Sequence, residues 1–399
     1  MRQVYRFFAA VFSTAVIGTM GSALYLQATL PDTFTVNSGE KLQLASQYDY
    51  VSCSSPKQSI SVYGADSESY SSQLRLLGLV SIKDVTVRVA DEQEVAICGV
   101  PFGIKMTTEG VMVVGTASVP TDSGPVCPAR LAGIQEGDLL LSLAGHSTLS
   151  NSLIAQLVRQ SEGAPLALCY QRGDQKTETI ITPALSSTDG QYHIGLWVRD
   201  SSAGIGTLTF CDPVSGQFAG LGHAICDVDT GLLMPLSKGE VVHASINGLS
   251  PGQAGKPGEL HGAFSENTAW GTIEQNCASG IYGQFLSGWE QFPLISTAHA
   301  QEIEEGPAQL LCTISGSEAQ YYDVEIERIH SYDDKSGRNL ILHITDEELL
   351  EETGGILQGM SGSPLVQNEK LIGAVTHVFV NDPTRGYGIF IENMLEAAS

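Results

Sequence analysis

GMSGSPLVQNEKLIGAV, at residues 359–375, decides the fold more than any other stretch of this sequence. Glycines at positions 354, 355, 359 and 362 surround Ser361 and allow the positive φ angles of a tight turn. Two short apolar runs follow, at 365–367 and 371–375, with Asn368 and Glu369 between them. This pattern predicts a β-hairpin that holds the turn and exposes the Ser361 hydroxyl.

A serine hydroxyl is a weak nucleophile until an imidazole takes its proton, so a reactive Ser361 requires a histidine from another segment. His223 is the first candidate among the nine histidines, because the small residues of FAGLGHAI, at 218–225, would let another loop approach its ring. His377, which lies beyond the hairpin, is the second candidate. For each of them the alternative is an ordinary surface or core histidine.

An acid is then needed to orient the imidazole and to stabilise its charged form. Asp346, in LHITDEELL at residues 342–350, ends a predicted strand and begins a short predicted helix. A structural role explains it equally well, because Thr345 and Glu348 form a capping box and an acid in the first turn suits the helix dipole. The residues alone leave both roles of Asp346 open.

Composition excludes several classes of protein. With 399 residues, 42% of them hydrophobic, the chain can bury at least two cores and is too apolar to be disordered. A net charge of -24 would repel phosphate backbones, so nucleic acid is not an expected partner. The eight cysteines form no CxxC pair or Cys/His cluster, so we expect no metal site, no dense disulfide framework and no cofactor.

The N-terminus predicts a transmembrane signal anchor over residues 1–31. Arg2 and Arg6 precede FFAAVFSTAVIGTMGSALYLQATLP, the uncharged residues 7–31, and about 20 apolar residues suffice to cross a bilayer. The basic end stays in the cytoplasm, so the rest of the chain is expected to be membrane-anchored on the extracytoplasmic side. The alternative is a cleaved signal peptide, for which residues 21–23 offer a small-residue cleavage site.

Three further regions follow the anchor. Residues 32–95 are polar and Ser-rich and end in an alternating run, which indicates a spacer with β-strands. Residues 96–184 contain two apolar strand-like runs, a helix-like segment at 150–160 and a final strand pair. Residues 185–399 are rich in glycine and in short alternating runs, which favours a closed or sandwiched β architecture large enough for two small barrels.

Within 96–184, the residues Ala132-Gly133-Ile134, Gly137-Asp138 and Gly145-His146 resemble the pattern of a PDZ domain. The resemblance implies that peptide C-termini bind by β-augmentation along a strand at 105–108. It also implies a loop that receives the peptide carboxylate, made of Gly99, Val100, Pro101, Phe102, Gly103 and Ile104.

The stretch at 359–375 resembles the nucleophile loop of chymotrypsin-like serine proteases. The resemblance implies a mainly β fold with a double β-barrel, with Ser361 as nucleophile and the backbone amides of Gly359 and Ser361 as the oxyanion hole. Ser363 departs from that pattern, which usually has glycine there, and leaves Ser363 as a second candidate hydroxyl.

Taken together, the anchor, the PDZ-like region and the motifs GLGHAICDVDTG, HITDEELL and HVFVNDPTRGYG resemble the stage IV sporulation protein B (SpoIVB) peptidase family. In that family the catalytic histidine, aspartate and serine fall in motifs that match His223, Asp346 and Ser361 here. The resemblance implies a serine endopeptidase of sporulation signalling, in the space between forespore and mother cell. Its implied substrates are its own N-terminal segment and a membrane-bound regulatory protein, whose cleavage activates pro-sigma-K processing.

Other functions fit fewer residues. Asp122-Ser123-Gly124 and Asp229-Thr230-Gly231 match the triplet of aspartic proteases, but each half of such a dyad needs its own lobe. A calcium loop around Asp227 and Asp229 lacks the bidentate glutamate expected at its end. The alternative from another class is a non-catalytic PDZ envelope scaffold, which would not depend on Ser361 at all.

Overall fold

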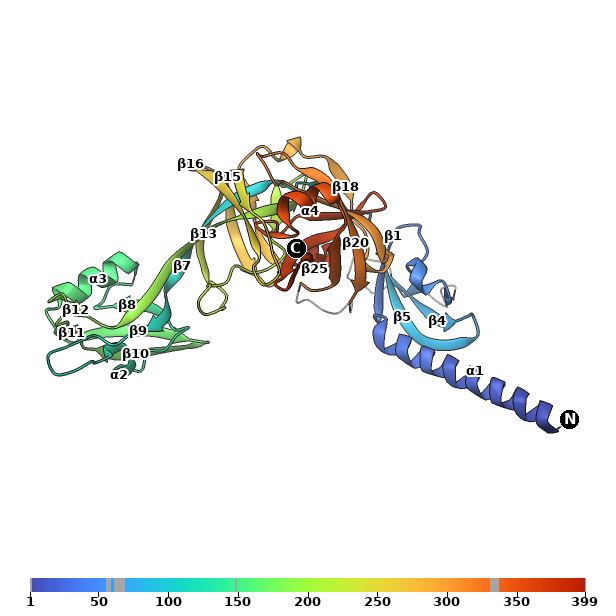
Figure 1. Cartoon of the computed structure of the whole chain (residues 1–399), viewed down its shortest axis with the longest axis horizontal. Coiled ribbons are helices and arrows are strands. Elements are labelled where there is room, and N and C mark those ends of the chain that lie inside the picture. Colours follow the sequence, from blue (N-terminus) through green and yellow to red (C-terminus); the bar gives the residue numbers. More distant parts are fainter. Residues whose placement is uncertain (1, 55–58, 61–68, 148, 331–336, 399) are drawn as a thin grey trace.

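A computed structural model describes residues 2–54, 59–60, 69–147, 149–330 and 337–398. Figure 1 shows an elongated molecule in which the PDZ-like module and helix α1 lie at opposite ends of a central pair of β-barrels. The expected mainly β architecture, with an apolar N-terminal helix, a PDZ-like module and a double barrel, is confirmed.

Helix α1 (Arg2–Thr29) extends away from the body of the protein (Figure 1). Its segment Tyr5–Thr29 is long and apolar enough to cross a membrane. The last turns of the helix are packed against the following domain, where Ala23 and Leu26 are buried in a hydrophobic core with Leu30, Phe34 and Val87. The helix is therefore joined rigidly to the domain that follows it.

The region predicted as a spacer is a packed domain with this core. Its sheet has the strand order β1-β5-β4-β2, with β3 beside β4 and β1 parallel to β5. The strands are β1 (Thr33–Asn37), β2 (Val51–Cys53), β3 (Ser59–Ile60), β4 (Ser69–Leu76) and β5 (Val80–Ala90). Part of the Ser-rich stretch, residues 55–58 and 61–68, lies outside the described residues.

The PDZ-like module is inserted into the first barrel, between the two halves of one long hairpin. That hairpin is made of β7 (Pro101–Thr116) and β13 (Leu196–Cys211). The two strands pair from Pro101↔Thr207 to Thr107↔Ser201 in the barrel, and from Met112↔Arg199 to Thr116↔Leu196 in the module. The other elements of the module are α2 (Pro128–Leu131), β8 (Leu139–Leu143), α3 (Asn151–Gln160), β9 (Leu166–Arg172), β10 (Gln175–Ile181), β11 (Ala184–Leu185) and β12 (Tyr192–His193). The module thus begins and ends later than the predicted boundaries of 96 and 184.

The first barrel is a ring of six strands in the order β7-β15-β16-β17-β14-β13, closed by the pairing of β13 with β7. Its remaining strands are β14 (Gln217–Gly220), β15 (Leu236–Ser250), β16 (Gly258–Cys277) and β17 (Gly280–Phe285), with β6 (Glu94–Ile97) and β18 (Leu294–Ser296) added at β13. Phe102, Phe218 and Trp270 belong to its hydrophobic core.

The second barrel is closed by six strands in the order β19-β20-β21-β25-β24-β23. Its elements are β19 (Gly306–Cys312), β20 (Gln320–Ile329), β21 (Leu340–Ile344), α4 (Glu347–Thr353), β22 (Leu357–Gln358), β23 (Pro364–Gln367), β24 (Lys370–Phe379), β25 (Asp382–Phe390) and α5 (Ile391–Ala398). The predicted hairpin after Ser361 is the β23–β24 hairpin, with Asn368 and Glu369 at its tip.

The expected carboxylate loop at Gly99, Val100, Pro101, Phe102, Gly103 and Ile104 is wrong. Phe102 is fully buried and packs against Phe218 in the first barrel, with ring centroids 6.5 Å apart. A Cβ atom at Gly103 would lie 2.7 Å from a Val242 methyl group, so a side chain has no room at that position. The strand predicted to bind peptide, 105–108, already pairs with β13 on one edge and β15 on the other.

The insertion predicts that the barrels fold without the PDZ-like module. Thr108 and Asp200 face each other across the hairpin, and the Thr108 hydroxyl donates to the Asp200 carbonyl at 3.2 Å. Replacing residues 109–199 with Asn-Gly, which suits a tight hairpin turn, should leave barrels that still unfold in a cooperative thermal transition. Circular dichroism checks this, and aggregation or a non-cooperative transition would show that the module is needed for folding.

Candidate active site

Ser361 lies on the turn between β22 and β23, where the two barrels meet. Gly359 and Gly362 adopt φ angles of 101° and 93°, which favour glycine. At Gly362 a Cβ atom would lie 2.1 Å from the Thr207 carbonyl oxygen and 2.5 Å from the Leu221 amide nitrogen. Glycine at this position therefore allows the turn to touch the first barrel.

Strand β13 of the first barrel holds this turn by three hydrogen bonds. The Thr207 amide donates to the Ser361 carbonyl at 3.0 Å, and the Thr207 hydroxyl donates to the Gly359 carbonyl at 2.9 Å. The Thr209 hydroxyl donates to the Gly362 carbonyl at 2.7 Å. Both threonines are buried, so these bonds fix the orientation of the peptide groups around Ser361.

The two candidate hydroxyls differ in access. Ser361 is partly exposed, and its hydroxyl donates to the Thr376 carbonyl at 2.8 Å. Ser363 is fully buried, and its hydroxyl has no hydrogen-bond partner among the described residues. A substrate can reach Ser361 without opening the barrel, whereas Ser363 is enclosed, so the geometry favours Ser361 as the nucleophile.

Two histidines reach the same place from different barrels. His223 follows β14 in the first barrel, and His377 lies on β24, next to the Thr376 carbonyl that binds Ser361. The centroids of the two imidazole rings are 4.8 Å apart and the ring planes are inclined by 38°. In the described part of the chain, the Ser361 hydroxyl forms no hydrogen bond with either ring.

The surroundings of His223 fix its tautomer and its charge. Its Nδ1 lies 2.9 Å from the Ala224 carbonyl, which can only accept, so Nδ1 carries the proton and Nε2 is free to act as a base. Burial lowers the pKa of His223, although the bond to Ala224 works in the opposite direction. Partial burial, together with His223 and Arg338, lowers the pKa of His377 to about 4. Both rings are therefore neutral at pH 7.

Asp346 is at the N-cap of α4. One carboxylate oxygen accepts the Leu349 amide at 2.9 Å, and the other accepts the Asp323 amide at 3.2 Å. No hydrogen bond or ion pair joins it to a histidine within the residues that the structure describes. Of the two roles that the sequence left open, this geometry is that of the helix cap.

The Ser361 amide, an expected oxyanion donor, differs from its neighbours in its hydrogen bonding. The amides of three neighbouring residues donate within the protein: Met360 to Leu357 at 3.1 Å, Gly362 to Val375 at 2.8 Å and Ser363 to Met360 at 2.9 Å. The Ser361 amide donates to no backbone carbonyl in the described part of the chain. The other expected donor, Gly359, has its carbonyl held by Thr207.

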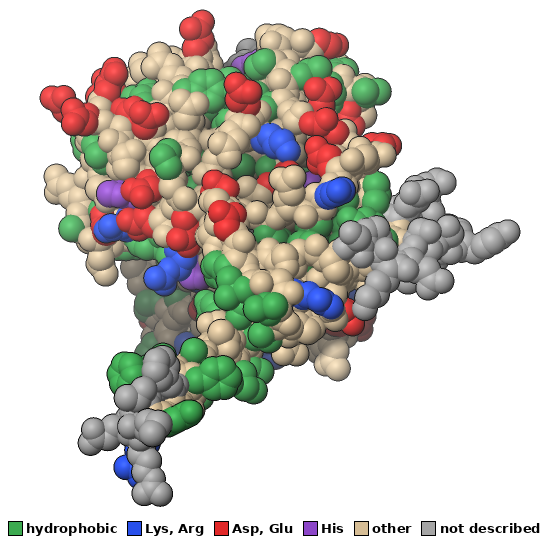
Figure 2. Space-filling model, turned by 90° about the vertical axis from the view of Figure 1, so that its right-hand side faces the viewer, with side chains coloured by type: hydrophobic (Ala, Val, Ile, Leu, Met, Phe, Trp, Pro, Cys, Tyr) green, Lys and Arg blue, Asp and Glu red, His purple; other side chains and the backbone are tan. Residues whose placement is uncertain are grey.

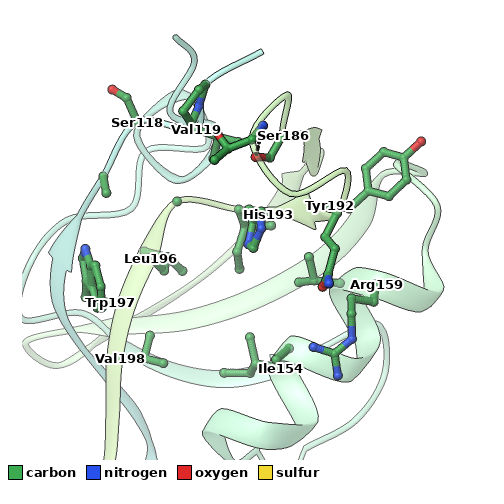
Figure 3. Close-up of a pocket in the computed structure, with 18 of the residues that line it drawn as sticks. Ser118, Val119, Ile154, Arg159, Ser186, Tyr192, His193, Leu196, Trp197 and Val198 are labelled. Carbon is green, nitrogen blue, oxygen red and sulfur yellow. Dashed lines mark hydrogen bonds between the residues drawn. The ribbon is translucent and has the colours of Figure 1, made fainter.

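The PDZ-like module has a groove, but at a place that the sequence did not indicate. A cavity of about 560 Å³ lies between α3 and the start of β13, and Figure 3 shows Ile154 of α3 opposite Leu196 and Val198 of β13. One edge of this part of β13 pairs with β7, while the edge towards α3 has no strand partner among the described residues. An extended peptide could add to this free edge.

The other sequence patterns have structural explanations. Arg199 bridges Asp227 at 2.7 Å and Asp229 at 2.8 Å, so an arginine occupies the place where a calcium ion was considered. Within the described ranges, no group of three or more His, Cys, Asp or Glu side chains could hold a metal ion. All eight cysteines are described and unpaired, and four of them are buried.

Two closed six-stranded barrels with a serine and an imidazole at their junction define a serine peptidase of the double-barrel class. Comparison with known families agrees with this class. The chain belongs to the SpoIVB peptidase family, because the model of that family, SpoIVB peptidase S55, matches residues 190–395.

Similar proteins cover smaller parts of the chain. Serine protease HTRA1 of Xenopus tropicalis is 36% identical over 59 residues, which are 15% of this chain and 13% of that protein. The chain therefore spans only about an eighth of the length of this curated relative. The solved PDZ domain of an SdrC-like protein from Listeria monocytogenes is 24% identical, with a TM-score of 0.19, and covers 23% of this chain and 90% of that domain.

Sequence reasoning missed the groups that assemble the site. His377 was only a second candidate for the base, yet its ring lies against His223. Thr207 and Thr209 alternate in GTLTF, residues 206–210, as in any strand with one buried face, and nothing in that pattern shows which loop they bind.

We predict that Thr207→Val slows the reaction of Ser361 by about tenfold or more, because the Gly359 carbonyl loses its donor and the oxyanion site loses its fixed geometry. The measurement is the second-order rate of labelling by a serine-directed phosphonate, together with the melting temperature. Thr207→Ser, which keeps the hydroxyl, should restore the rate.

The matched control is Thr313→Val. Thr313 is also buried and donates its hydroxyl to a backbone carbonyl, that of Gly99 at 3.2 Å, in a pair that includes no residue of the nucleophile turn. Equal slowing in both variants at equal loss of stability would mean that Thr207 acts on the fold and not on the site.

Proposed function

We propose that this peptidase is a membrane-tethered serine endopeptidase of sporulation signalling, with His223, Asp346 and Ser361 as its catalytic residues. The observation that carries the proposal is that Ser361 binds the Thr376 carbonyl at the barrel junction while the ring of the next residue, His377, lies against His223. The signalling role is supported by membership of the SpoIVB peptidase family.

The proposed chemistry is acyl transfer. Nε2 of His223 takes the proton of Ser361 while Oγ attacks the carbonyl carbon of a peptide bond. The amides of Gly359 and Ser361 stabilise the oxyanion, and the imidazolium then protonates the leaving amine. Water hydrolyses the acyl-enzyme by the same steps, and the serine is regenerated.

The first step requires a rearrangement of the serine side chain. In this structure the Ser361 hydroxyl donates to the Thr376 carbonyl, so its proton points away from an imidazole acceptor. Rotation about the Cα–Cβ bond exchanges this hydrogen bond for one to Nε2 of His223. Such a rotation between staggered positions is local and leaves the turn held by β13 unchanged.

The role of Asp346 rests on the family resemblance. In the proposed active form its carboxylate stabilises the imidazolium of His223, as the acid does in serine peptidase triads. Because the carboxylate caps α4 here, this role requires the first turn of the helix to release it.

Helix α1 supports the proposed tether. Its basic N-terminal end carries Arg2 and Arg6, so we place it in the cytoplasm and the barrels in the extracytoplasmic space between forespore and mother cell. A peptidase held at a membrane suits the substrates that the family implies, its own N-terminal segment and a membrane-bound regulator of pro-sigma-K processing.

The groove of the PDZ-like module supplies a second recognition site in this proposal. Apolar residues of α3 and β13 line it, including Ile154, Val158 and Leu196, which suits a peptide C-terminus with an apolar last residue. A substrate or regulator bound there would be present at a high local concentration near the active site.

We predict that Ser361→Ala and His223→Ala both abolish self-cleavage, because each removes a group needed to form the acyl-enzyme. The loss is typically at least about a hundredfold for such residues. Mass spectrometry of the full chain, expressed beside the wild type, detects removal of the N-terminal segment. If both variants shorten like the wild type, another protease makes the cut, and the non-catalytic scaffold gains support.

Asp346→Asn separates the two roles of Asp346. Asparagine keeps the cap on the Leu349 amide but loses the oxygen that accepts the Asp323 amide, so the melting temperature should fall by only a few degrees. A triad acid, in contrast, typically contributes about 10⁴-fold in rate, and we expect a loss of this order in phosphonate labelling and self-cleavage. Full activity in this variant would reduce the site to Ser361 and His223, oriented by the Ala224 carbonyl.

A further inference from the structure

The turn between β4 and β5 presents two leucines to solvent beside the apolar helix α1. Leu77 is 63% exposed and Leu79 is 84% exposed, and the nearby Tyr50 is 43% exposed. Between this turn and the helix lies a groove of about 670 Å³. We name Tyr50, Leu77 and Leu79 the apolar tip.

The backbone of this turn has a conformation that leucine rarely adopts. Leu77 and Gly78 both have left-handed φ angles, 52° and 71°, and the Leu77 amide donates to the Tyr50 carbonyl at 2.7 Å. Leucine is disfavoured in this conformation, where glycine or asparagine is usual. Since Leu77 is exposed, packing within the domain does not compensate for the strain.

Two other hairpin tips of the molecule are polar, whereas Val380, at the tip between β24 and β25, is 52% exposed. The β23–β24 hairpin places Asn368 and Glu369 at left-handed φ angles of 51° and 62°, and the β9–β10 hairpin has Gly173 and Asp174 at its end. The apolar tip therefore departs from the pattern of these two hairpins, and it lies beside α1.

The groove lies at the depth of a membrane if α1 spans one. The hydrocarbon layer of a bilayer is about 30 Å thick, which about 20 helical residues can cross. Counted from Phe7, the first residue after the last arginine of the helix, such a span ends at Leu26. The helix residues that line the groove all fall between Ala15 and Leu26, in the outward part of this span. The facing wall, Tyr50, Leu76 and Leu77, is then at the same depth.

The charges of the surface agree with this placement. Figure 2, which views the molecule from the α1 side, shows hydrophobic side chains on and beside the projecting helix and acidic side chains gathered over the opposite part of the body. The acidic body avoids an anionic lipid surface, whereas an uncharged tip can enter it.

We propose that the apolar tip inserts into the outer leaflet and that lipid acyl chains fill the groove between the tip and α1. This inference rests on the proposed membrane tether. It adds a second point of attachment, so that the N-terminal sheet domain is fixed against the membrane in one orientation. Lipid is the occupant that we favour, because the groove is continuous with the exposed surface of the membrane-spanning helix.

The test uses the full chain reconstituted in phosphatidylcholine vesicles, with and without brominated acyl chains, which quench tryptophan in contact with them. Leu79→Trp reports on the tip. Val214→Trp is the matched control, because Val214 is 89% exposed on a turn of the first barrel. The three native tryptophans, Trp197, Trp270 and Trp289, are the same in both variants.

In the Leu79→Trp variant we expect the added indole emission to fall by about half or more in brominated vesicles, whereas the emission added by Val214→Trp should be unchanged. The double variant Leu77→Asn with Leu79→Trp has asparagine at position 77, which suits the turn. It should show less quenching, because the apolar side chain of Leu77 is no longer present to insert into the membrane.

Three results overturn the inference. Absence of quenching in the Leu79→Trp variant, with an emission like that of the Val214→Trp variant, would show that the tip is in water. A blue-shifted emission from the Leu79→Trp variant that bromine does not quench would show that protein, such as a second copy of α1, covers the groove. Failure of the chain to float with vesicles would remove the tether itself, whereas flotation without quenching leaves the tether intact.

Discussion

The active site depends on the contacts that Thr207 makes with both barrels. Its amide and hydroxyl bind the carbonyls of Ser361 and Gly359 in the second barrel, while its own carbonyl accepts the Leu221 amide at 3.2 Å. Leu221 begins the turn that ends at His223, so one residue of β13 sets the position of the Ser361 turn and of the His223 turn. Because buried hydrogen bonds are directional and costly to break, the distance between these two turns is fixed to within narrow limits.

The same strand explains how a recognition module can be attached without disturbing the site. β13 begins in the groove at Leu196 and reaches the nucleophile turn at Thr207. Register shifts at Trp197/Val198 and Arg199/Ser201 separate its two parts, and bulges of this kind absorb bends. From Ser201 to Thr207 the strand is paired with β7, which is itself held by β15. The bulges therefore let the strand bend into the module while the ladder keeps Thr207 in place.

Short-range patterns predicted the elements of this protein well, whereas long-range pairing was not visible in the sequence. The glycines around Ser361 and the hairpin after it each follow from a few neighbouring residues. The expected capping box of Thr345 and Glu348 was wrong by one residue, because the N-cap of α4 is Asp346 and its side chain accepts the Leu349 amide. The run 101–108 has the alternation of a strand, but alternation does not tell which strands become its neighbours. It resembled the start of a PDZ domain because the true module begins in the second half of the same strand, β7. An insertion inside a continuous hairpin leaves no linker of the usual composition, so the boundary could not be read from glycine, proline or charge.

The burial of His223 has two opposite consequences for its proposed role as a general base. His223 is neutral at pH 7 because burial lowers its pKa, and a neutral imidazole is what a general base requires. The same burial opposes the imidazolium that forms when Ser361 gives up its proton. In this structure the ring faces the Ala224 carbonyl, the neutral ring of His377 and, beyond it, the cationic Arg338, none of which carries a compensating negative charge. A carboxylate at Nδ1 would stabilise the cation far better than a carbonyl dipole, since hydrogen bonds between opposite charges are about twice as strong. The physical case for an acid, for which we propose Asp346 released from its cap, thus follows from the burial of His223 itself.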